Sequence, residues 1–147
     1  IIGGTVRGTV NGILVMLLGV VLIDMPVHQP LATIGFIVMV SWAFASMGLV
    51  LGQLSDSWDQ LAMMQNFFLT PLSFLGGVFY SVNMLPDWAK TLSFFNPIYY
   101  MINGIRFTIL GVADSPPMTS FTMALIMTIF FSVSAIILMH SGRKIKQ

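Results

Sequence analysis

Cysteine and glutamate are absent from this chain of 147 residues, and charged residues make up only 7% of it. Without cysteine, the chain has neither a disulfide framework nor a thiol site. Its acids are aspartates spread along the sequence, and no G-x-x-x-x-G-K-[ST] pattern occurs, which excludes nucleotide binding through a P-loop. We therefore predict that the chain is not an enzyme and binds no metal or cofactor of its own.

Hydrophobic residues, by contrast, make up 56% of the chain. An average soluble domain carries about 25% charged residues, and a soluble domain of this composition would have to expose large apolar patches to water. Uncharged runs of about 20 apolar residues match the thickness of the bilayer core instead. The composition favours an all-α membrane protein, a polytopic bundle of transmembrane helices, over an unusually apolar soluble helical domain.

Four apolar runs predict membrane spans at residues 6–23, 31–51, 61–80 and 118–139. The first is marginal, because its length corresponds to about 27 Å at 1.5 Å per residue, with Arg7 able to extend to the headgroups. The third contains polar residues and Pro71, so we expect it either to line a polar space or to be kinked and packed against its neighbours. A candidate capping box, Ser57 with Gln60, precedes it.

Basic residues follow the last run, at Arg143, Lys144 and Lys146. By the positive-inside rule they predict a cytoplasmic C-terminus. Counting back through four spans then places Arg7 and the turn before the third run on the cytoplasmic side, and the long segment before the last run outside. His28 and His140 fall on opposite sides of the membrane, which excludes a metal site shared by them.

The segment between the third and fourth runs, residues 81–117, is longer than a helix connection usually requires. It is rich in aromatic residues of the kind found at membrane interfaces. Its helical part, residues 86–112, is divided at Asn96 and Pro97, and neither piece is long enough to span a bilayer. We expect two short outer helices that dip into the outer face of the membrane, or lie on it, without crossing.

Arg106 and Gly104 lie within the second of these pieces. A central arginine would cost about 2.5 to 3.5 kcal/mol in a transmembrane helix, which argues against a full crossing. Arg106 is expected to be an interfacial anchor or the partner of Asp114 or Asp87; the alternative is contact with a substrate.

Small residues recur at spacings that suit close helix packing. The three sets are Gly4, Gly8 and Gly12; Gly48 and Gly52; and Ala124, Thr128 and Ser132. They predict a compact bundle and would also suit packing against a second copy of the chain. The alternative is that glycine is simply common in membrane helices.

Gln65, Asn66 and Thr70, inside the third run, are the candidate polar lining of a pathway. On an α-helix these positions lie within about 140° of arc. Uncharged polar groups suit a large or amphipathic substrate better than an ion, which requires rings of acids or carbonyls. The alternative is that they make hydrogen bonds between helices.

The stretch "FFLTPLSFLGGVFYSVNMLPDWAKTLSFFNPIYYMINGIRFTILGV", residues 67–112, resembles the C-terminal signature region of ABC-2 type permeases, the membrane subunits of bacterial ABC exporters. The blocks "LTPLSFLGGVFYS" and "NPIYYMINGIRF" carry the resemblance, and the pattern of spans extends it over the whole chain. Carried over position by position, the structural elements of the signature are Pro71, Gly76, Gly77, Pro97 and Gly104. Asn96 and Arg106 join the last two as candidate structural or gating residues of the outer helices.

The resemblance implies a six-helix transmembrane domain of which residues 1–147 form the C-terminal part, with four spans and the family's short outer helices before the last one. It also implies a bacterial inner-membrane protein that works as a homodimer or heterodimer with a cytoplasmic ATPase, on which ATP and Mg²⁺ are bound. Membrane lipid is a further partner, and nucleic acid is not. Because the chain begins "IIGGTVRG", without an initiator methionine, we expect it to be a piece of a longer protein.

The function implied is that of a permease subunit of an ATP-driven exporter, forming the translocation pathway. Two alternatives remain: a membrane scaffold or regulator that transports nothing, and a secondary transporter or channel, which should show ionisable residues buried within its spans. Substrates of the family range from drugs to polysaccharides and lipid-linked glycans, and the residues do not separate these classes beyond a weak lean toward export of drugs and nodulation factors.

Overall fold

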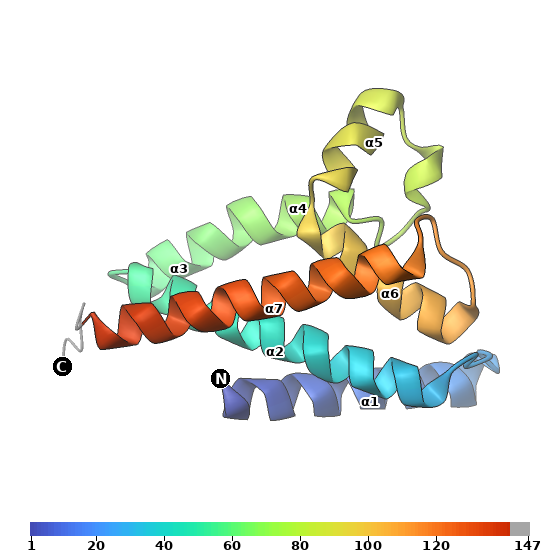
Figure 1. Ribbon diagram of the computed structural model, residues 1–147, viewed down its shortest axis with the longest axis horizontal. Helices are drawn as coiled ribbons and strands as arrows, with labels where there is room; N and C mark the ends of the chain where they lie inside the picture. Colours follow the sequence, from blue (N-terminus) through green and yellow to red (C-terminus); the bar gives the residue numbers. More distant parts are fainter. Residues whose placement is uncertain (142–147) are drawn as a thin grey trace.

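The computed structural model describes residues 1–141 and contains only helices, turns and loops in that range (Figure 1). The helical elements are α1 (Ile2–Ile23), α2 (Pro30–Leu54), α3 (Trp58–Met64), the π-helical turn η1 (Gln65–Leu69), α4 (Thr70–Leu75), the 3-10 turn η2 (Val82–Met84), α5 (Asp87–Phe94), α6 (Pro97–Leu110) and α7 (Pro117–His140). The all-α prediction is confirmed. The basic residues used to orient the chain, Arg143, Lys144 and Lys146, lie outside the described residues.

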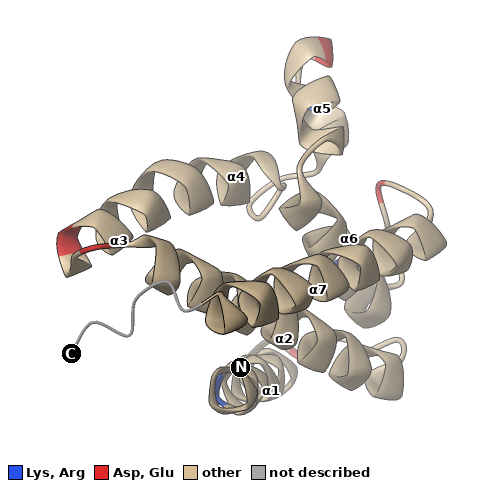
Figure 2. Cartoon of the chain, turned by 60° about the vertical axis from the view of Figure 1, so that its left-hand side comes forward, with Lys and Arg blue, Asp and Glu red and all other residues tan. Residues whose placement is uncertain are grey.

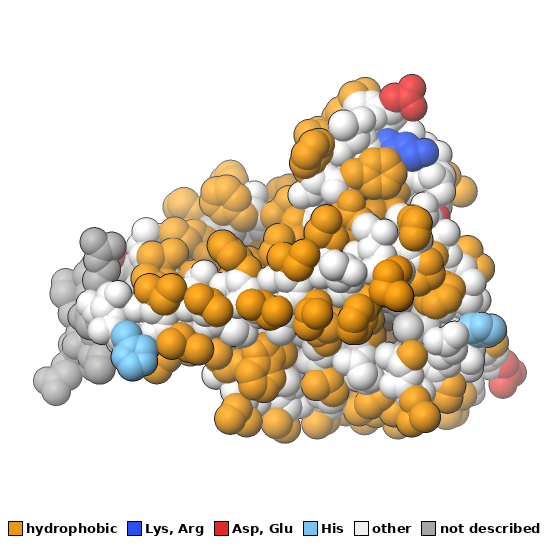
Figure 3. Space-filling model, viewed as in Figure 1, with side chains coloured by type: hydrophobic (Ala, Val, Ile, Leu, Met, Phe, Trp, Pro, Cys, Tyr) orange, Lys and Arg blue, Asp and Glu red, His pale blue; other side chains and the backbone are white. Residues whose placement is uncertain are grey.

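Three helices, α1, α2 and α7, are long and apolar enough to cross a membrane. They contain the predicted spans at residues 6–23, 31–51 and 118–139. Figure 3 shows hydrophobic side chains over the exposed face of α7 and the helices beneath it, and Figure 2 shows the acidic residues in turns and at helix ends. This distribution is the one expected of helices whose outer surface faces lipid rather than water.

The predicted span at residues 61–80 differs from a regular crossing. Residues 58–75, which we call the arm, are helical but divided into α3, η1 and α4, and the helix ends before Gly76 rather than at Tyr80. Pro71 explains the division: it has no N–H to donate, and in a regular α-helix its ring would clash with the carbonyl four residues earlier. The chain widens into a π turn instead, in which the Thr70 N–H donates to the Gln65 carbonyl. The structure therefore has three uninterrupted spans and one interrupted helix, in place of four regular spans.

The first set of small residues packs α1 against α2, as predicted. A Cβ added to Gly4, Gly8 or Gly12 would lie within 3 Å of a side-chain atom of Ala45, Ser41 and Ile37, respectively. Each glycine therefore allows a close approach of the two antiparallel helices, at intervals of four residues on each. Close backbone contact of this kind is a main source of helix association in lipid.

The third set packs α7 against α2. Ala124 is fully buried at this interface, the Trp42 indole N–H donates to the Ser132 hydroxyl at 2.9 Å, and the Ser46 hydroxyl lies 3.3 Å from it. Gly48 and Gly52 differ, because a Cβ at either position would meet no atom of the described chain within 4 Å. The close packing predicted for this pair is therefore not made among residues 1–141.

Helices α5 and α6 form a re-entrant hairpin. The first residues of α6, Pro97 and Ile98, line a cavity together with Ala43 and Met47, which lie near the middle of α2. The last turn of α6 lies beside the α1–α2 loop. The backbone N–H groups of His28 and Gln29 in that loop donate to the carbonyls of Ile109 and Thr108 at 2.8 and 2.9 Å, respectively. Helix α6 thus runs from mid-bundle back to the end of the bundle that holds the α1–α2 loop, so this segment does not cross the bundle, as predicted.

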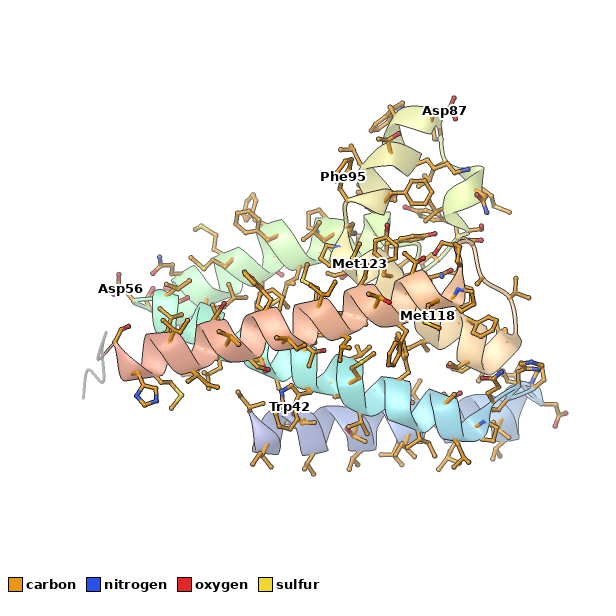
Figure 4. The ribbon with its side chains drawn as sticks, in the orientation of Figure 1. Trp42, Asp56, Asp87, Phe95, Met118 and Met123 are labelled. Atoms are coloured by element: carbon orange, nitrogen blue, oxygen red, sulfur yellow. The ribbon has the colours of Figure 1, made fainter. Side chains whose placement is uncertain are left out.

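Cysteine labelling tests the predicted orientation, and these 147 residues contribute no native cysteine to the background. Asp59 and Asp87 are both exposed and each lies in the first turn of a short helix, α3 and α5. Asp56 lies three residues before Asp59, and Figure 4 shows Asp56 and Asp87 at different ends of the molecule. We expect Asp87→Cys to react with an impermeant maleimide on intact cells, and Asp59→Cys to react only after permeabilisation. The reverse pattern would invert the topology.

Candidate functional site

Asp114, in the loop between α6 and α7, is the centre of a polar network in the outer segment. Its carboxylate accepts a hydrogen bond from Arg106 Nη1 at 2.9 Å and from the Ser81 hydroxyl at 2.6 Å. It also accepts one from the Val82 backbone N–H and one from Asn83 Nδ2, both at 3.2 Å. Both charged side chains are mostly buried, with Asp114 10% exposed and Arg106 21% exposed. The bonds from Ser81, Val82 and Asn83 to Asp114 hold the loop before α5 against the loop between α6 and α7.

Arg106 also binds the chain at the end of the arm. Its second terminal nitrogen, Nη2, donates to the carbonyl oxygen of Gly77. Gly77 has φ of 81°, in the left-handed region, and an added Cβ would lie 3.0 Å from the Tyr80 carbonyl oxygen and 3.1 Å from Val82 Cγ2. Of the two acids considered as partners of Arg106, the structure shows contact with Asp114. Gly77 is a turn residue whose backbone conformation and close neighbours favour glycine.

Asn103 extends the network into the bundle. Its carbonyl oxygen accepts from the Asp114 backbone N–H at 2.8 Å, and its amide donates to the hydroxyls of Ser115 at 2.9 Å and Ser120 at 2.7 Å. Asn103 is 1% exposed, and its polar atoms are satisfied across three segments of the chain. The sequence analysis missed Asn103; the signal available was its position three residues before Arg106, which places the two on one face of α6.

Asn96 and Ser93 join the hairpin to the arm. Asn96 Oδ1 accepts from the Ile98 backbone N–H and so caps α6, in which Pro97 is the first residue. The Asn96 amide donates to the carbonyl of Leu72 in α4, and the Ser93 hydroxyl donates to that of Leu75 at 2.8 Å. The outer-segment candidates Asn96 and Pro97 thus lie at the contact between α6 and α4.

Two glycines allow α6 to approach its neighbours closely. A Cβ on Gly104 would lie 2.7 and 2.8 Å from two ring carbons of Phe36, a buried residue of α2. A Cβ on Gly76 would lie 2.8 Å from Cδ1 of Ile102, in α6. Both positions are structural in the sense that a larger residue would displace α6.

Tyr99 is the largest of the fully buried side chains of the described chain, and its ring packs edge-on against Phe94 and Tyr100. Burial raises the pKa of the Tyr99 phenol above its ordinary value of 10.0. The hydroxyl therefore remains protonated at physiological pH and adds no charge beside the Arg106–Asp114 pair.

The candidate pathway residues lie on the arm, away from this network. Gln65, Asn66 and Thr70 are exposed, and their side chains make no hydrogen bond to another helix within residues 1–141. The interhelical bonds considered as the alternative are therefore not made in this part of the chain. Because the π turn bonds Thr70 to Gln65 through the backbone, these two residues lie one turn apart along the same side of the arm.

An apolar cavity of about 100 Å³ lies behind the arm. It is lined by Leu69 and Leu72 of the arm and, from the bundle, by Ala43, Phe44, Met47, Pro97, Ile98, Met101 and Phe131. Within residues 1–141 no group of three or more His or Asp side chains could hold a metal ion.

Comparison with known proteins identifies the family. No solved structure matches the chain. It is 35% identical over 144 residues to the inner membrane transport permease YadH of Escherichia coli strain K12, a match that covers 98% of this chain and 56% of the relative, and the corresponding Shigella flexneri protein matches equally. Nodulation protein J of Rhizobium leguminosarum bv. viciae is 38% identical over 69 residues, which is 47% of this chain and 27% of that protein.

The chain thus spans about half the length of the curated relatives that it matches over nearly its whole extent. The family model described as "ABC-2 type transporter" matches residues 1–110, which include α1, α2, the arm and the hairpin. With its apolar helices, these matches support a multi-pass inner-membrane protein. The chain belongs to the ABC-2 type transporter family.

Proposed function

We propose that this chain is the C-terminal part of the permease subunit of an ATP-driven exporter and forms part of its translocation pathway. The observation that carries the proposal is the match to an inner membrane transport permease along 98% of the chain. Since the sequence has no P-loop, a separate cytoplasmic ATPase would bind ATP and Mg²⁺ and supply the energy.

The arm is the proposed lining of the pathway. It carries exposed polar groups in the middle of a mostly apolar helix. Exposed polar residues in a membrane helix are favourable where they face a polar space. Gln65, Asn66 and Thr70 would contact a large or amphipathic substrate through uncharged hydrogen bonds. The permease would act as a homodimer or heterodimer, with the second copy across the pathway from the arm.

The alternatives differ from export in observable ways. A secondary transporter should carry ionisable groups buried within its spans. In residues 1–141 the Arg106–Asp114 pair lies in the outer segment, and Arg7, in α1, is exposed. A scaffold or regulator would keep the same bundle but would have no ATPase partner. Co-purification of the full-length permease with any ATPase encoded beside it distinguishes an exporter from a scaffold. A scaffold would not bring down an ATPase whose activity responds to a transported compound.

Substitutions on the arm test the pathway. In proteoliposomes that contain the full-length permease and its ATPase, we expect Gln65→Leu with Thr70→Val to lower ATP-dependent transport about 10-fold, the effect of losing roughly 1.4 kcal/mol of hydrogen bonding to the substrate. A panel of compounds that stimulate ATP hydrolysis supplies the substrate.

The control is Ser134→Ala, which removes a partly exposed hydroxyl from a membrane helix, in this case α7. We expect it to leave transport unchanged. Equal transport by the arm variant and the wild type would remove the arm from the pathway, and transport that continues without the ATPase would contradict an ATP-driven mechanism.

A further inference from the structure

The outer half of the arm is firmly attached to the bundle. Side chains from α5 and α6 donate to the last carbonyls of α4 and the turn after it: Asn96 to Leu72, Ser93 to Leu75 and Arg106 to Gly77. The second of these bonds measures 2.8 Å, and Ser93 and Asn96 are buried. Movement of α4 would therefore break several buried hydrogen bonds at once, which makes it unfavourable.

The inner half is attached much more loosely. Helix α3 contacts the bundle chiefly through α2, near the turn that joins the two helices. Across that turn the Ser55 hydroxyl lies 3.7 Å from the sulfur of Met64, a weak contact. Trp58 is 86% exposed and Met63 61%. Few buried contacts mean that local movement of α3 costs little.

The π turn lies between these two halves. In η1 the backbone follows the wider hydrogen-bonding pattern, and Pro71, just after it, has no N–H to contribute to the helix ladder. Kinks in helices occur at prolines and at π turns, and here the two coincide. The arm is therefore expected to bend most easily at residues 65–70, next to the end of its firmly attached half.

An apolar cavity lies beside this junction. The cavity of about 100 Å³ separates Leu69 of the π turn from Ala43 and Met47 of α2 and from Phe131 of α7. Its lining is apolar, so closing it would leave no buried polar group unsatisfied and would gain van der Waals contact.

We propose that the arm is a hinged element: α3 pivots about residues 65–70 while α4 stays fixed to the α5–α6 hairpin. One position is that of the structure, in which the cavity is open. In the other, the arm closes on α2 and α7 at Leu69 and fills the cavity. Gln65, Asn66 and Thr70 all lie in the hinge, so the pivot would change how they lie relative to one another. Their role in transport rests on the proposed function; the hinge does not.

Interspin distances test the hinge without any transport. We would place one pair of spin labels at Met63 of α3 and Ile136 of α7, across the inner half, and another at Phe74 of α4 and Leu125 of α7, across the outer half; all four residues are exposed. The full-length protein would be measured in lipid nanodiscs, diluted with unlabelled copies so that distances within one chain dominate. We expect the inner distribution to be about twice as broad as the outer one, as for a segment that moves between two positions.

A variant links that breadth to the π turn. Pro71→Ala restores the N–H and removes the ring, so the arm can become a regular α-helix, and the inner distribution should narrow to the width of the outer one. The matched control is Pro30→Ala, at the first residue of α2, where the absent N–H has no partner within the helix and the breadth should not change.

The wild-type comparison stands by itself if Pro71→Ala does not fold. An inner distribution as narrow as the outer one would overturn the hinge, and so would a folded Pro71→Ala protein whose inner distribution stays broad. A broad inner distribution in a protein that transports nothing would contradict the proposed function and leave the hinge in place. A narrow inner distribution in a protein that exports a substrate would contradict the hinge and leave the proposed function in place.

Discussion

Asp114→Ala is expected to lower the free energy of unfolding by about 3 kcal/mol, because it leaves a mostly buried guanidinium without its counter-charge. The Val82 backbone N–H and the Ser81 hydroxyl lose their acceptor at the same time. For a chain of this size the change corresponds to a fall in melting temperature of about 10 °C, measurable by thermal unfolding of the full-length protein in detergent.

Two further variants decide whether the effect belongs to the network. Asp87→Ala removes an exposed outer aspartate and should change the free energy of unfolding by no more than about 1 kcal/mol, the value of a charge at a helix N-terminus. Arg106→Ala combined with Asp114→Ala should cost less than the sum of the two single changes, since the residues act as a pair. Strict additivity would mean that they do not stabilise one another.

Gly104→Val is expected to destabilise the protein by about 3 kcal/mol, at the upper end of the cost of overpacking a core. The first carbon of the new side chain would lie within 3 Å of the Phe36 ring, which is buried between α2 and α6 and cannot move freely. The same thermal assay measures the loss, and the fraction of protein recovered as a monodisperse species from the membrane provides a second readout.

Gly35→Val is the matched control. It changes the residue next to Phe36 in the same helix, but a Cβ at Gly35 meets no described atom within 4 Å. We expect it to change the free energy of unfolding by less than about 1 kcal/mol, the range of helix propensities between these residues. Equal losses at both positions would show that helix propensity, rather than the contact with Phe36, decides the outcome.

The sequence predicted the uninterrupted spans well because their cause is local. Residues 31–51 and 118–139 are apolar without a break, and that property alone makes a helix of membrane length favourable. The two outer helices were also placed within two residues of their observed bounds, since Asn96 and Pro97 carry a strong helix-start signal.

The arm was predicted less well, because its shape depends on a balance between local and tertiary effects. Pro71 indicated a kink, but whether a helix bends, breaks or widens at a proline depends on the contacts around it. The end of the arm is set by the turn at Gly77, whose left-handed backbone is held by Arg106 from 29 residues away. A sequence window around the third run contains no sign of that contact.

The polar network was predicted only in part for the same reason. Arg106 and Asp114 were considered as partners because opposite charges are scarce in this chain. Asn103 looks, in sequence, like a single amide in an apolar helix, and its partners become apparent only when the loop before α7 folds back over α6. The role of Gln65, Asn66 and Thr70 stays a prediction.

The glycine pairing of α1 and α2 has one more consequence. Gly4, Gly8 and Gly12 repeat every four residues, which corresponds to about 6 Å along the helix. Sliding α1 by that distance would set Gly8 against Ala45 and Gly12 against Ser41, so that a glycine would again lie beside a small side chain. The contact surface alone therefore tolerates two alignments. The short link at residues 24–29, tied to the end of α6 by the backbone of His28 and Gln29, is what selects one of them. Lengthening that link by a few residues should let the first span sit at more than one depth in the bilayer.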